Sequence, residues 1–348
     1  MIHTLSLCSV CYKKIPARIH FADGMAIMTK ECDVHGPFTA VVEKDIQHVS
    51  NFYHRGTLGN NNTIIIHTHN DCNMECPWCY YPMGKEKMQP FSYYQSLLGF
   101  PYNGFRLLFS GGEPTLRPDF FEFHHEAYIR GWGPSSITNM IRLGDDDFFK
   151  ATMNEEHVTG NLYRFAMSMQ HPKNYPEAVL RQKIRAIENI ESKGLKAMCA
   201  MFSIQSLDEL DYNREFYDRT KHTYTMLRIR TMFGNWENKG AEKLFLSDLH
   251  KAFIEKFSDL MPTLSETVEK SNMYCLYLAM KDGMQVSLSS APTVENVDYH
   301  VCSRPVFMLA MDGRCYSVPL AQIANEGFMK GWHSGFRLQG GATCGQPQ

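Results

Sequence analysis

Three cysteines lie within eight residues of the segment CNMECPWCYY (72–81). Cys72, Cys76 and Cys79 have the spacing C-x3-C-x2-C. Thiolates are the usual protein ligands of iron–sulfur clusters, and an electron-transfer cluster normally takes four of them. Three ligands would leave one iron of a cubic [4Fe-4S] cluster open to a small molecule, just as an open position separates a catalytic zinc site from a structural one. The spacing therefore predicts a cluster that binds a further ligand.

A second group of metal donors lies nearer the N-terminus. Cys8, Cys11, Cys32 and His35 have the spacing C-x2-C-x20-C-x2-H, on both sides of an Ala-Asp-Gly turn at 22–24. Two close pairs of N/S donors across a hairpin fit a closed tetrahedral zinc site, which would stabilise a segment too short to form its own core. Mononuclear iron and unconnected buried thiols are the alternatives, and the histidine favours zinc over iron.

The remaining cysteines are scattered along the second half of the chain, at Cys199, Cys275, Cys302, Cys315 and Cys344. The last four could ligate one auxiliary iron–sulfur cluster. Cys199 and Cys275 lie in apolar, strand-like runs, and buried free cysteines are common. Structural thiols are therefore the default interpretation.

Alternating strand-like and helix-like stretches begin at about residue 63. Apolar runs predict six strands, at 63–69, 106–110, 135–140, 162–169, 195–204 and 223–230. Helical spacing predicts helices at 118–130, 144–156, 175–193, 207–219 and 239–260. Strands that alternate with helices form parallel βαβ units. The sequence therefore predicts an α/β fold with a partial (β/α)6 TIM-like barrel.

The flanks of this predicted barrel have a different pattern. Three domains are expected: a Cys/His zinc-knuckle β segment at 1–55, the barrel at 56–262, and a C-terminal β-hairpin cap or extension at 263–348. Within the last domain, 274–289 and 306–318 each place Asp-Gly between alternating apolar residues, which is typical of β-hairpins.

Composition excludes several classes of protein. A chain of 348 residues with 44% hydrophobic and 21% charged residues can bury a large core. The net charge of −2 gives no broad basic surface for a nucleic-acid polymer. No apolar run approaches the roughly 20 residues of a membrane span, and the N-terminus lacks a secretory signal. We expect a cytoplasmic protein, whose reducing compartment favours metal ligands and buried thiols over disulfides.

The cysteine loop has a recognisable context. The segment THNDCNMECPWCYY (68–81) resembles the cluster loop of the radical S-adenosylmethionine (radical SAM) superfamily, and SGGEPT (110–115) resembles its second signature. The resemblance implies a [4Fe-4S] cluster whose open iron is chelated by S-adenosylmethionine. One electron, from a donor such as flavodoxin or ferredoxin, would cleave the sulfonium to a 5′-deoxyadenosyl radical. That radical would take hydrogen from an unactivated C–H bond of the substrate.

The second signature implies cofactor contacts for Gly111, Gly112 and Glu113. Glycines allow the backbone to approach a ligand closely, and the carboxylate could accept from the ammonium group of S-adenosylmethionine. A tight β-to-α turn with an exposed acid is the alternative.

Two later strands supply weaker matches. Asn139 and Ser168 correspond to polar cofactor contacts in the family, although Met140 stands where the family usually has Gly; helix capping and turn stabilisation are the alternatives. Arg228 and Arg230 share one face of the sixth strand and could hold an anionic group inside the barrel. Alternation along one strand also allows both to point outward, which is the default expectation.

The N-terminal sequence pattern C-x2-C…IPAR…K-x-C-x-x-HG resembles that of the radical SAM branch that contains the tetraether lipid synthases and the methanopterin methylases. The resemblance covers about residues 1–230. This implies C–C bond formation, alkylation or rearrangement on a small-molecule or nucleotide-like substrate, with no catalytic residue assigned. A peptide-modifying maturase with an auxiliary cluster is one alternative. A non-catalytic iron–sulfur and zinc protein that senses redox state or iron is another.

Overall fold

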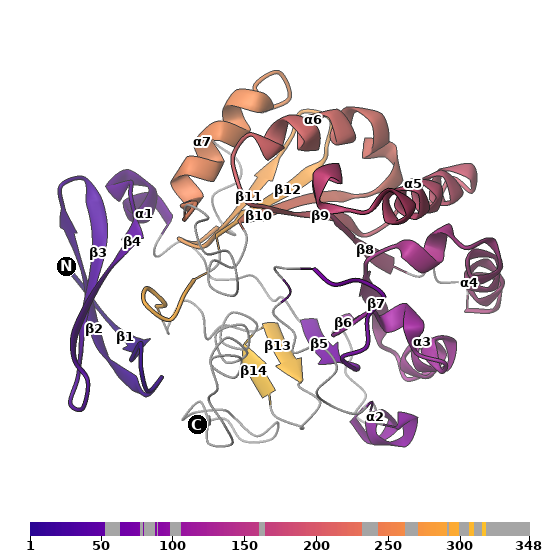
Figure 1. The fold of residues 1–348 in the computed structure, drawn as a ribbon, viewed down its shortest axis with the longest axis horizontal. Coiled ribbons are helices and arrows are strands. Elements are labelled where there is room, and N and C mark those ends of the chain that lie inside the picture. Colours follow the sequence, from indigo (N-terminus) through magenta and orange to yellow (C-terminus); the bar gives the residue numbers. More distant parts are fainter. Residues whose placement is uncertain are drawn as a thin grey trace.

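The computed structural model describes residues 1–52, 63–76, 79, 88, 90–97, 106–159, 164–231, 243–261, 271–290, 292–298, 306–309 and 315–317. Strands of these residues form two sheets, a four-stranded sheet near the N-terminus and a ten-stranded sheet that carries most of the helices (Figure 1).

The N-terminal sheet is antiparallel, with its strands in chain order. It consists of β1 (Ile2–Leu7), β2 (Lys14–Ala22), β3 (Met25–Cys32) and β4 (Gly36–Glu43). Alternate residues of β3 are buried, as expected for a sheet with one covered face. Helix α1 (Ile46–Phe52) follows, and the apolar core of this sheet continues into Tyr274, Val294 and Val297. The predicted N-terminal β segment is therefore confirmed as a compact antiparallel unit.

The larger sheet has the order β11-β12-β10-β9-β8-β7-β6-β5-β13-β14. Its centre contains the six predicted strands, β5 (Thr63–His67), β6 (Arg106–Ser110), β7 (Gly133–Thr138), β8 (Arg164–Met169), β9 (Cys199–Ile204) and β10 (Met226–Thr231). Neighbours among these six pair in parallel. The predicted α/β class and its parallel β/α units are confirmed.

The two predicted C-terminal hairpins are confirmed and join this same sheet. They are formed by β11 (Cys275–Ala279) with β12 (Gln285–Ser289), and by β13 (Val306–Leu309) with β14 (Cys315–Ser317). Strand β12 pairs in parallel with β10, and β13 pairs in parallel with β5, so the hairpins extend both edges of the sheet. Ten strands less the two antiparallel edge strands leave eight parallel ones. The predicted domain boundaries at 55/56 and 262/263 lie outside the described residues.

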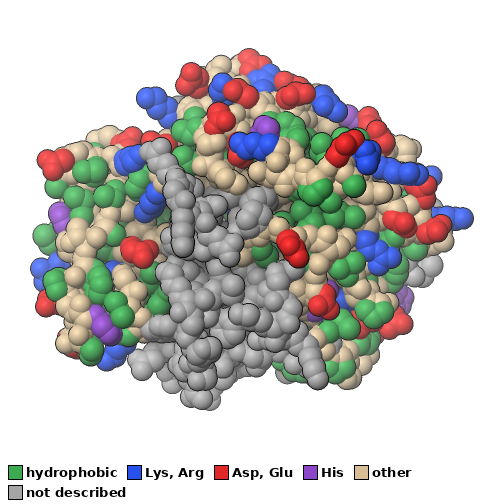
Figure 2. Space-filling model, viewed as in Figure 1, with side chains coloured by type: hydrophobic (Ala, Val, Ile, Leu, Met, Phe, Trp, Pro, Cys, Tyr) green, Lys and Arg blue, Asp and Glu red, His purple; other side chains and the backbone are tan. Residues whose placement is uncertain are grey.

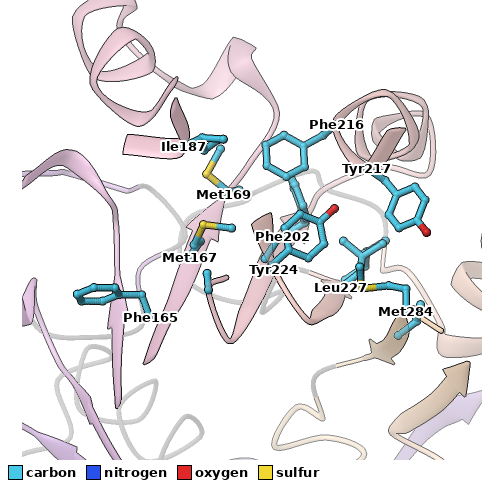
Figure 3. Packing of buried hydrophobic residues seen from close by; sticks show 14 of the residues in the cluster. Phe165, Met167, Met169, Ile187, Phe202, Phe216, Tyr217, Tyr224, Leu227 and Met284 are labelled. Atoms are coloured by element: carbon cyan, nitrogen blue, oxygen red, sulfur yellow. The ribbon is translucent and has the colours of Figure 1, made fainter. Parts of the chain in front are cut away.

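Helices cover one face of the curved sheet (Figure 1). Besides the short α2 (Phe91–Leu97), they are α3 (Phe120–Ile129), α4 (Asp146–Thr159), α5 (Glu177–Ser192), α6 (Glu209–Thr220) and α7 (Leu246–Lys256). Figure 3 shows the core beneath them, where Met167 and Met169 of β8 approach Ile187 of α5, and Phe202 of β9 approaches Phe216 of α6. We call the opposite face of the sheet the inner face.

Arg228 and Arg230 of β10 lie on the inner face. Their neighbours Leu227 and Ile229 belong to the core beneath the helices, and side chains alternate along a strand. The default expectation that both arginines point outward is therefore wrong. Leu227 and Ile229 pack against the helices on one face of the sheet, so Arg228 and Arg230 lie on the inner face.

Neither sign of charge predominates on the face of the molecule that Figure 2 shows. Figure 2 shows Lys and Arg interspersed with Asp and Glu over the part of this face that is coloured. Within the described ranges, no helix is both long and apolar enough to cross a membrane.

Candidate functional site

The N-terminal donors converge as a metal site would require. The ligand atoms of Cys8, Cys11, Cys32 and His35 all lie within 4.8 Å of one another. The Sγ atoms of Cys11 and Cys32 are 3.8 Å apart. A tetrahedral site with Zn–S bonds of about 2.3 Å has an edge of about 3.8 Å, so this spacing fits zinc.

The local backbone also positions these four side chains and favours the metal-binding form of one of them. Cys8 follows β1, Cys32 ends β3, and His35 lies in the turn before β4. A hydrogen bond from the backbone N–H of Val34, together with the His35 side chain, lowers the pKa of Cys32 to about 6. Thiolate is the form that binds metal, so the turn favours ligation.

The three cysteines of the cluster loop follow β5 and are half-buried. Burial, together with the charges of neighbouring groups, raises the pKa of Cys72 to about 11 and that of Cys76 to about 12. Three adjacent thiolates therefore need a cation to balance them. In the described part of the chain, only the N-terminal group converges closely enough for a single ion. Cys72, Cys76 and Cys79 do not form such a group.

The Gly-Gly-Glu segment docks on the cluster loop through its backbone. The N–H of Gly112 donates to the carbonyl of His69 at 2.6 Å, and the N–H of Glu113 donates to the carbonyl of Asp71 at 2.8 Å. A Cβ added to Gly112 would lie 2.0 Å from the Asp71 carbonyl oxygen. Gly111 has φ of +125°, a conformation that side chains rarely adopt. Both glycines are thus required for the close approach of two loops.

Glu113 is buried, with 1% of its surface exposed, so the alternative of an exposed acid is wrong. Its Oε1 accepts from the N–H and hydroxyl of Thr115 and from the hydroxyl of Thr138, and its Oε2 accepts from the N–H of Asn139 at 2.6 Å. Burial raises the pKa of this carboxyl. A carboxylate oxygen has two lone pairs, so Oε1 is filled, while Oε2 can accept one more donor.

Asn139 connects the end of β7 to the cluster loop. Its Nδ2 donates to Asn73 Oδ1 at 2.7 Å and lies 3.7 Å from Cys72 Sγ. Its Oδ1 accepts from the N–H of Ile141 at 3.1 Å, so the same side chain also stabilises the following turn. Met140 has φ of 74°, a left-handed conformation. Glycine adopts that conformation at little cost, which explains why a Gly would be expected here.

Comparison with known proteins agrees with this geometry. Residues 1–44 match the family described as the HMPTM N-terminal zinc ribbon domain. Over 180 residues the chain is 27% identical to 7,8-dihydro-6-hydroxymethylpterin dimethyltransferase of Methanocaldococcus jannaschii. That match covers 42% of this chain and 36% of the relative's length.

Solved structures resemble the fold at low sequence identity. SuiB of Streptococcus suis bound to its precursor peptide SuiA has a TM-score of 0.52 and 14% identity, over 85% of this chain and 68% of SuiB. SuiB bound to S-adenosylmethionine has a TM-score of 0.51 and 14% identity, over 83% of this chain and 68% of SuiB. The resemblance to the radical SAM superfamily is confirmed.

Sequence reasoning missed one residue of this candidate site, Lys183 of α5. The side chain is fully buried, and Nζ donates to the carbonyls of Asn139 at 2.7 Å and Ser168 at 2.8 Å. Burial lowers the pKa of Lys183 to about 8, although the nearby charges of Cys76 and Glu113 oppose that shift. One lysine therefore joins the carboxyl ends of β7 and β8 beside the cluster loop.

A signal for this lysine was present in the sequence. Lys183 lies on the same helical stripe as the buried Ala186, Ile187 and Ile190, at spacings of three, four and seven residues. A charge on an apolar stripe is a candidate for a buried role.

Ser168, the other residue that Lys183 contacts, lies on the inner face. Its Oγ accepts from Gln170 Nε2 at 3.3 Å. Tyr175 in turn donates its hydroxyl proton to Gln170 Oε1. The backbone of Ser168 is thus fixed by Lys183, and its hydroxyl is fixed by Gln170.

The remaining cysteines do not converge within the described residues. Burial raises the pKa of Cys199 and that of Cys275, both on the inner face. Cys302 and Cys344 lie outside the described residues, as does the side chain of Cys315. The single auxiliary cluster stays a prediction.

Proposed function

We propose that this chain is a radical SAM enzyme in which Cys72, Cys76 and Cys79 hold a [4Fe-4S] cluster. When bound and reduced, the cluster supplies the electron for reductive cleavage of S-adenosylmethionine. The observation that carries the proposal is the docking of the Gly-Gly-Glu segment on the cluster loop, through hydrogen bonds from Gly112 and Glu113. A three-cysteine loop without this partner would carry no place for the cofactor's methionine.

The chain's own residues then bind and orient S-adenosylmethionine. Glu113 Oε2, which accepts only one protein donor among the described residues, is available to the methionine ammonium group. The backbone of Gly111 and Gly112 forms the adjoining edge, because neither residue has a side chain to block approach. Asn139 and Ser168, at the ends of neighbouring strands, provide polar groups for the rest of the cofactor.

Zinc at Cys8, Cys11, Cys32 and His35 has a structural role in this proposal. All four donors come from the protein, which is the pattern of a closed site without an open position for a reactant. The zinc fixes the ends of a small sheet whose core is continuous with the C-terminal segment. It takes no part in the chemistry.

The reaction that we favour is alkylation, or a related formation of C–C bonds, on a small or nucleotide-like molecule. The support is the relative named as a pterin dimethyltransferase. Similarity to SuiB concerns the fold alone, so peptide modification is the alternative. The electron donor would be a flavodoxin or ferredoxin, and the cytoplasm is the compartment that keeps the cluster and free thiols reduced.

Spectroscopy of the cluster tests this proposal. The full chain is reconstituted anaerobically with iron and sulfide, reduced with dithionite, and measured by electron paramagnetic resonance with and without S-adenosylmethionine. We expect the cofactor to change the spectrum, because it binds the open iron. Cys72→Ala should lose the cluster, and Cys199→Ala, on the inner face, should keep both cluster and response. A full, reducible cluster with an unchanged spectrum would favour the sensor alternative.

A further inference from the structure

Arg228 lies in a row of side chains that crosses the inner face and includes several polar groups. The residues opposite Arg228 on the adjacent strands are Met201 of β9 and Ser287 of β12. Ser287 in turn lies opposite Tyr277 of β11. Met201 pairs in turn with Ser168 of β8, a candidate cofactor contact. The row therefore runs from the site of Lys183 to the guanidinium group.

Arg230 lies one step nearer the carboxyl end of the same strand. Its neighbours in register are Ser203 and Ser289, and its Nε donates to Ser203 Oγ at 2.8 Å. Chemistry in parallel β/α folds occurs at this end of the strands. Two guanidinium groups and several hydroxyl groups thus share one region of the inner face.

The charge of Arg228 is not balanced by the described residues. The guanidinium is surrounded by Cys199, Cys275 and Tyr277, and it lies 4.0 Å from the sulfur of Met201. Burial raises the pKa of both thiols, so they are protonated and neutral at pH 7. Within the described ranges, Arg228 forms no ion pair with a carboxylate.

An unpaired cation in such surroundings calls for an anion. Removing a charge from water is costly unless an opposite charge is supplied. The guanidinium stays protonated and cannot escape this cost by titration. Its planar fork matches the two oxygens of a carboxylate or phosphate group.

We propose that Arg228 and Arg230 bind the anionic group, a carboxylate or phosphate, of the substrate. The proposal rests on the proposed function for the statement that the bound molecule is the substrate. Ser203 and Ser289 supply hydroxyl donors beside the two guanidinium groups. A neutral hydroxymethylpterin carries no such group, so the substrate differs from that molecule by bearing an anion.

Binding of inorganic phosphate tests the anion site without turnover. Isothermal titration of the reconstituted full chain measures the affinity for phosphate, and separately for S-adenosylmethionine. We expect saturable phosphate binding that Arg228→Met weakens by at least about tenfold, or about 1.4 kcal/mol. Arg230→Met should weaken it as well. The matched control is Arg181→Met, because Arg181 lies exposed on α5; its phosphate affinity should equal that of the wild type.

Further measurements distinguish anion binding by Arg228 from a role of Arg228 in folding alone. Arg228→Lys keeps the charge but loses the fork, so it should fold and bind phosphate with intermediate affinity. Phosphate should raise the thermal midpoint of the wild type more than that of Arg228→Met, since a bound ligand adds to the stability in excess of the general effect of the salt, which both proteins share. If Arg228→Met does not fold, the Lys variant and Arg230→Met decide the question.

Three results would overturn the inference. They are the absence of saturable phosphate binding, an affinity unchanged in Arg228→Met, and a parallel loss of S-adenosylmethionine binding. The last would mean that the arginines hold the cofactor's own carboxylate. If phosphate binding depends on Arg228 while the cluster does not respond to S-adenosylmethionine, the anion site stands and the proposed function fails.

Discussion

Glu113 and Lys183 bind opposite backbone groups of the same residue, Asn139. Glu113 Oε2 accepts from the Asn139 N–H at 2.6 Å, and Lys183 Nζ donates to the Asn139 carbonyl at 2.7 Å. Both side chains are buried, and their opposite charges offset part of the cost of removing each from water. Because Asn139 also contacts Asn73 of the cluster loop, this arrangement fixes the loop to the end of β7.

Replacing Lys183 should destabilise the fold. Lys183→Met leaves the carbonyls of Asn139 and Ser168 without their donor and leaves Glu113 without its opposite charge. We expect the free energy of unfolding to fall by about 2–4 kcal/mol, measured by urea denaturation. Lys193→Met, at the exposed end of the same helix, should change it by less than about 0.5 kcal/mol. Equal stability of the two variants would contradict this account.

Gly112 should tolerate no side chain. Gly112→Ala places a Cβ 2.0 Å from the Asp71 carbonyl oxygen, so the cluster loop must move. We expect lower iron and sulfide content after reconstitution and at least about tenfold less cleavage of S-adenosylmethionine, since small displacements at a reacting centre are costly. In the control, Gly133→Ala, the added Cβ meets no atom within 4 Å. Both properties should then match the wild type.

The sequence predicted the parts of this fold that depend on local patterns. The six central strands were visible as short apolar runs, and a predicted helix follows each of them after the first. The cysteine loop was found from its C-x3-C-x2-C spacing, and the Gly-Gly-Glu segment from its resemblance to the second radical SAM signature. The parallel pairing of β12 with β10 and of β13 with β5 was not predicted, since it joins segments far apart in the chain.

The site was predicted less completely for a related reason. Alternation on β10 shows that Arg228 and Arg230 share a face, but only the packing of Leu227 and Ile229 against helices shows which face it is. The second role of Gly112 also depended on tertiary structure, because its neighbour is a carbonyl 41 residues earlier in the chain.

Acid should destabilise the protein through buried histidines. Burial lowers the pKa of His124, whose Nε2 hydrogen-bonds with Ser136 Oγ, to about 3 from an ordinary value of 6.5. Between these values the unfolded chain binds a proton that the folded chain does not, so stability is present above pH 6.5 and is lost as the pH falls. From pH 7 to pH 5 this residue should cost about 2 kcal/mol.

A comparison of two histidine variants isolates the contribution of His124 to the pH dependence of stability. His124→Gln should reduce the loss of unfolding free energy between pH 7 and pH 5 by about 2 kcal/mol relative to the wild type. His125→Gln, at the adjacent half-buried position, serves as the matched control and should retain the wild-type pH dependence. A His124→Gln profile parallel to that of the wild type would show that this histidine does not titrate as described.

The N-terminal site should hold zinc. Elemental analysis of the purified chain should find about one zinc per chain. Cys32→Ala should lose most of it, whereas His35→Cys should retain it, because four cysteines are an established zinc ligand set. Cys199→Ala should leave the zinc content unchanged. Iron in place of zinc, with Cys32→Ala losing it, would support the mononuclear-iron alternative.

Reductive cleavage of S-adenosylmethionine tests the central claim most directly. The anaerobic, reconstituted chain is reduced with dithionite, and the products are followed by mass spectrometry beside Cys76→Ala, which lacks one cluster ligand. Formation of 5′-deoxyadenosine and methionine by the wild type, and not by Cys76→Ala, is the predicted result. Equal product from both proteins, or none from a wild type whose cluster is full and reduced and whose candidate anionic substrates are present, would contradict the account.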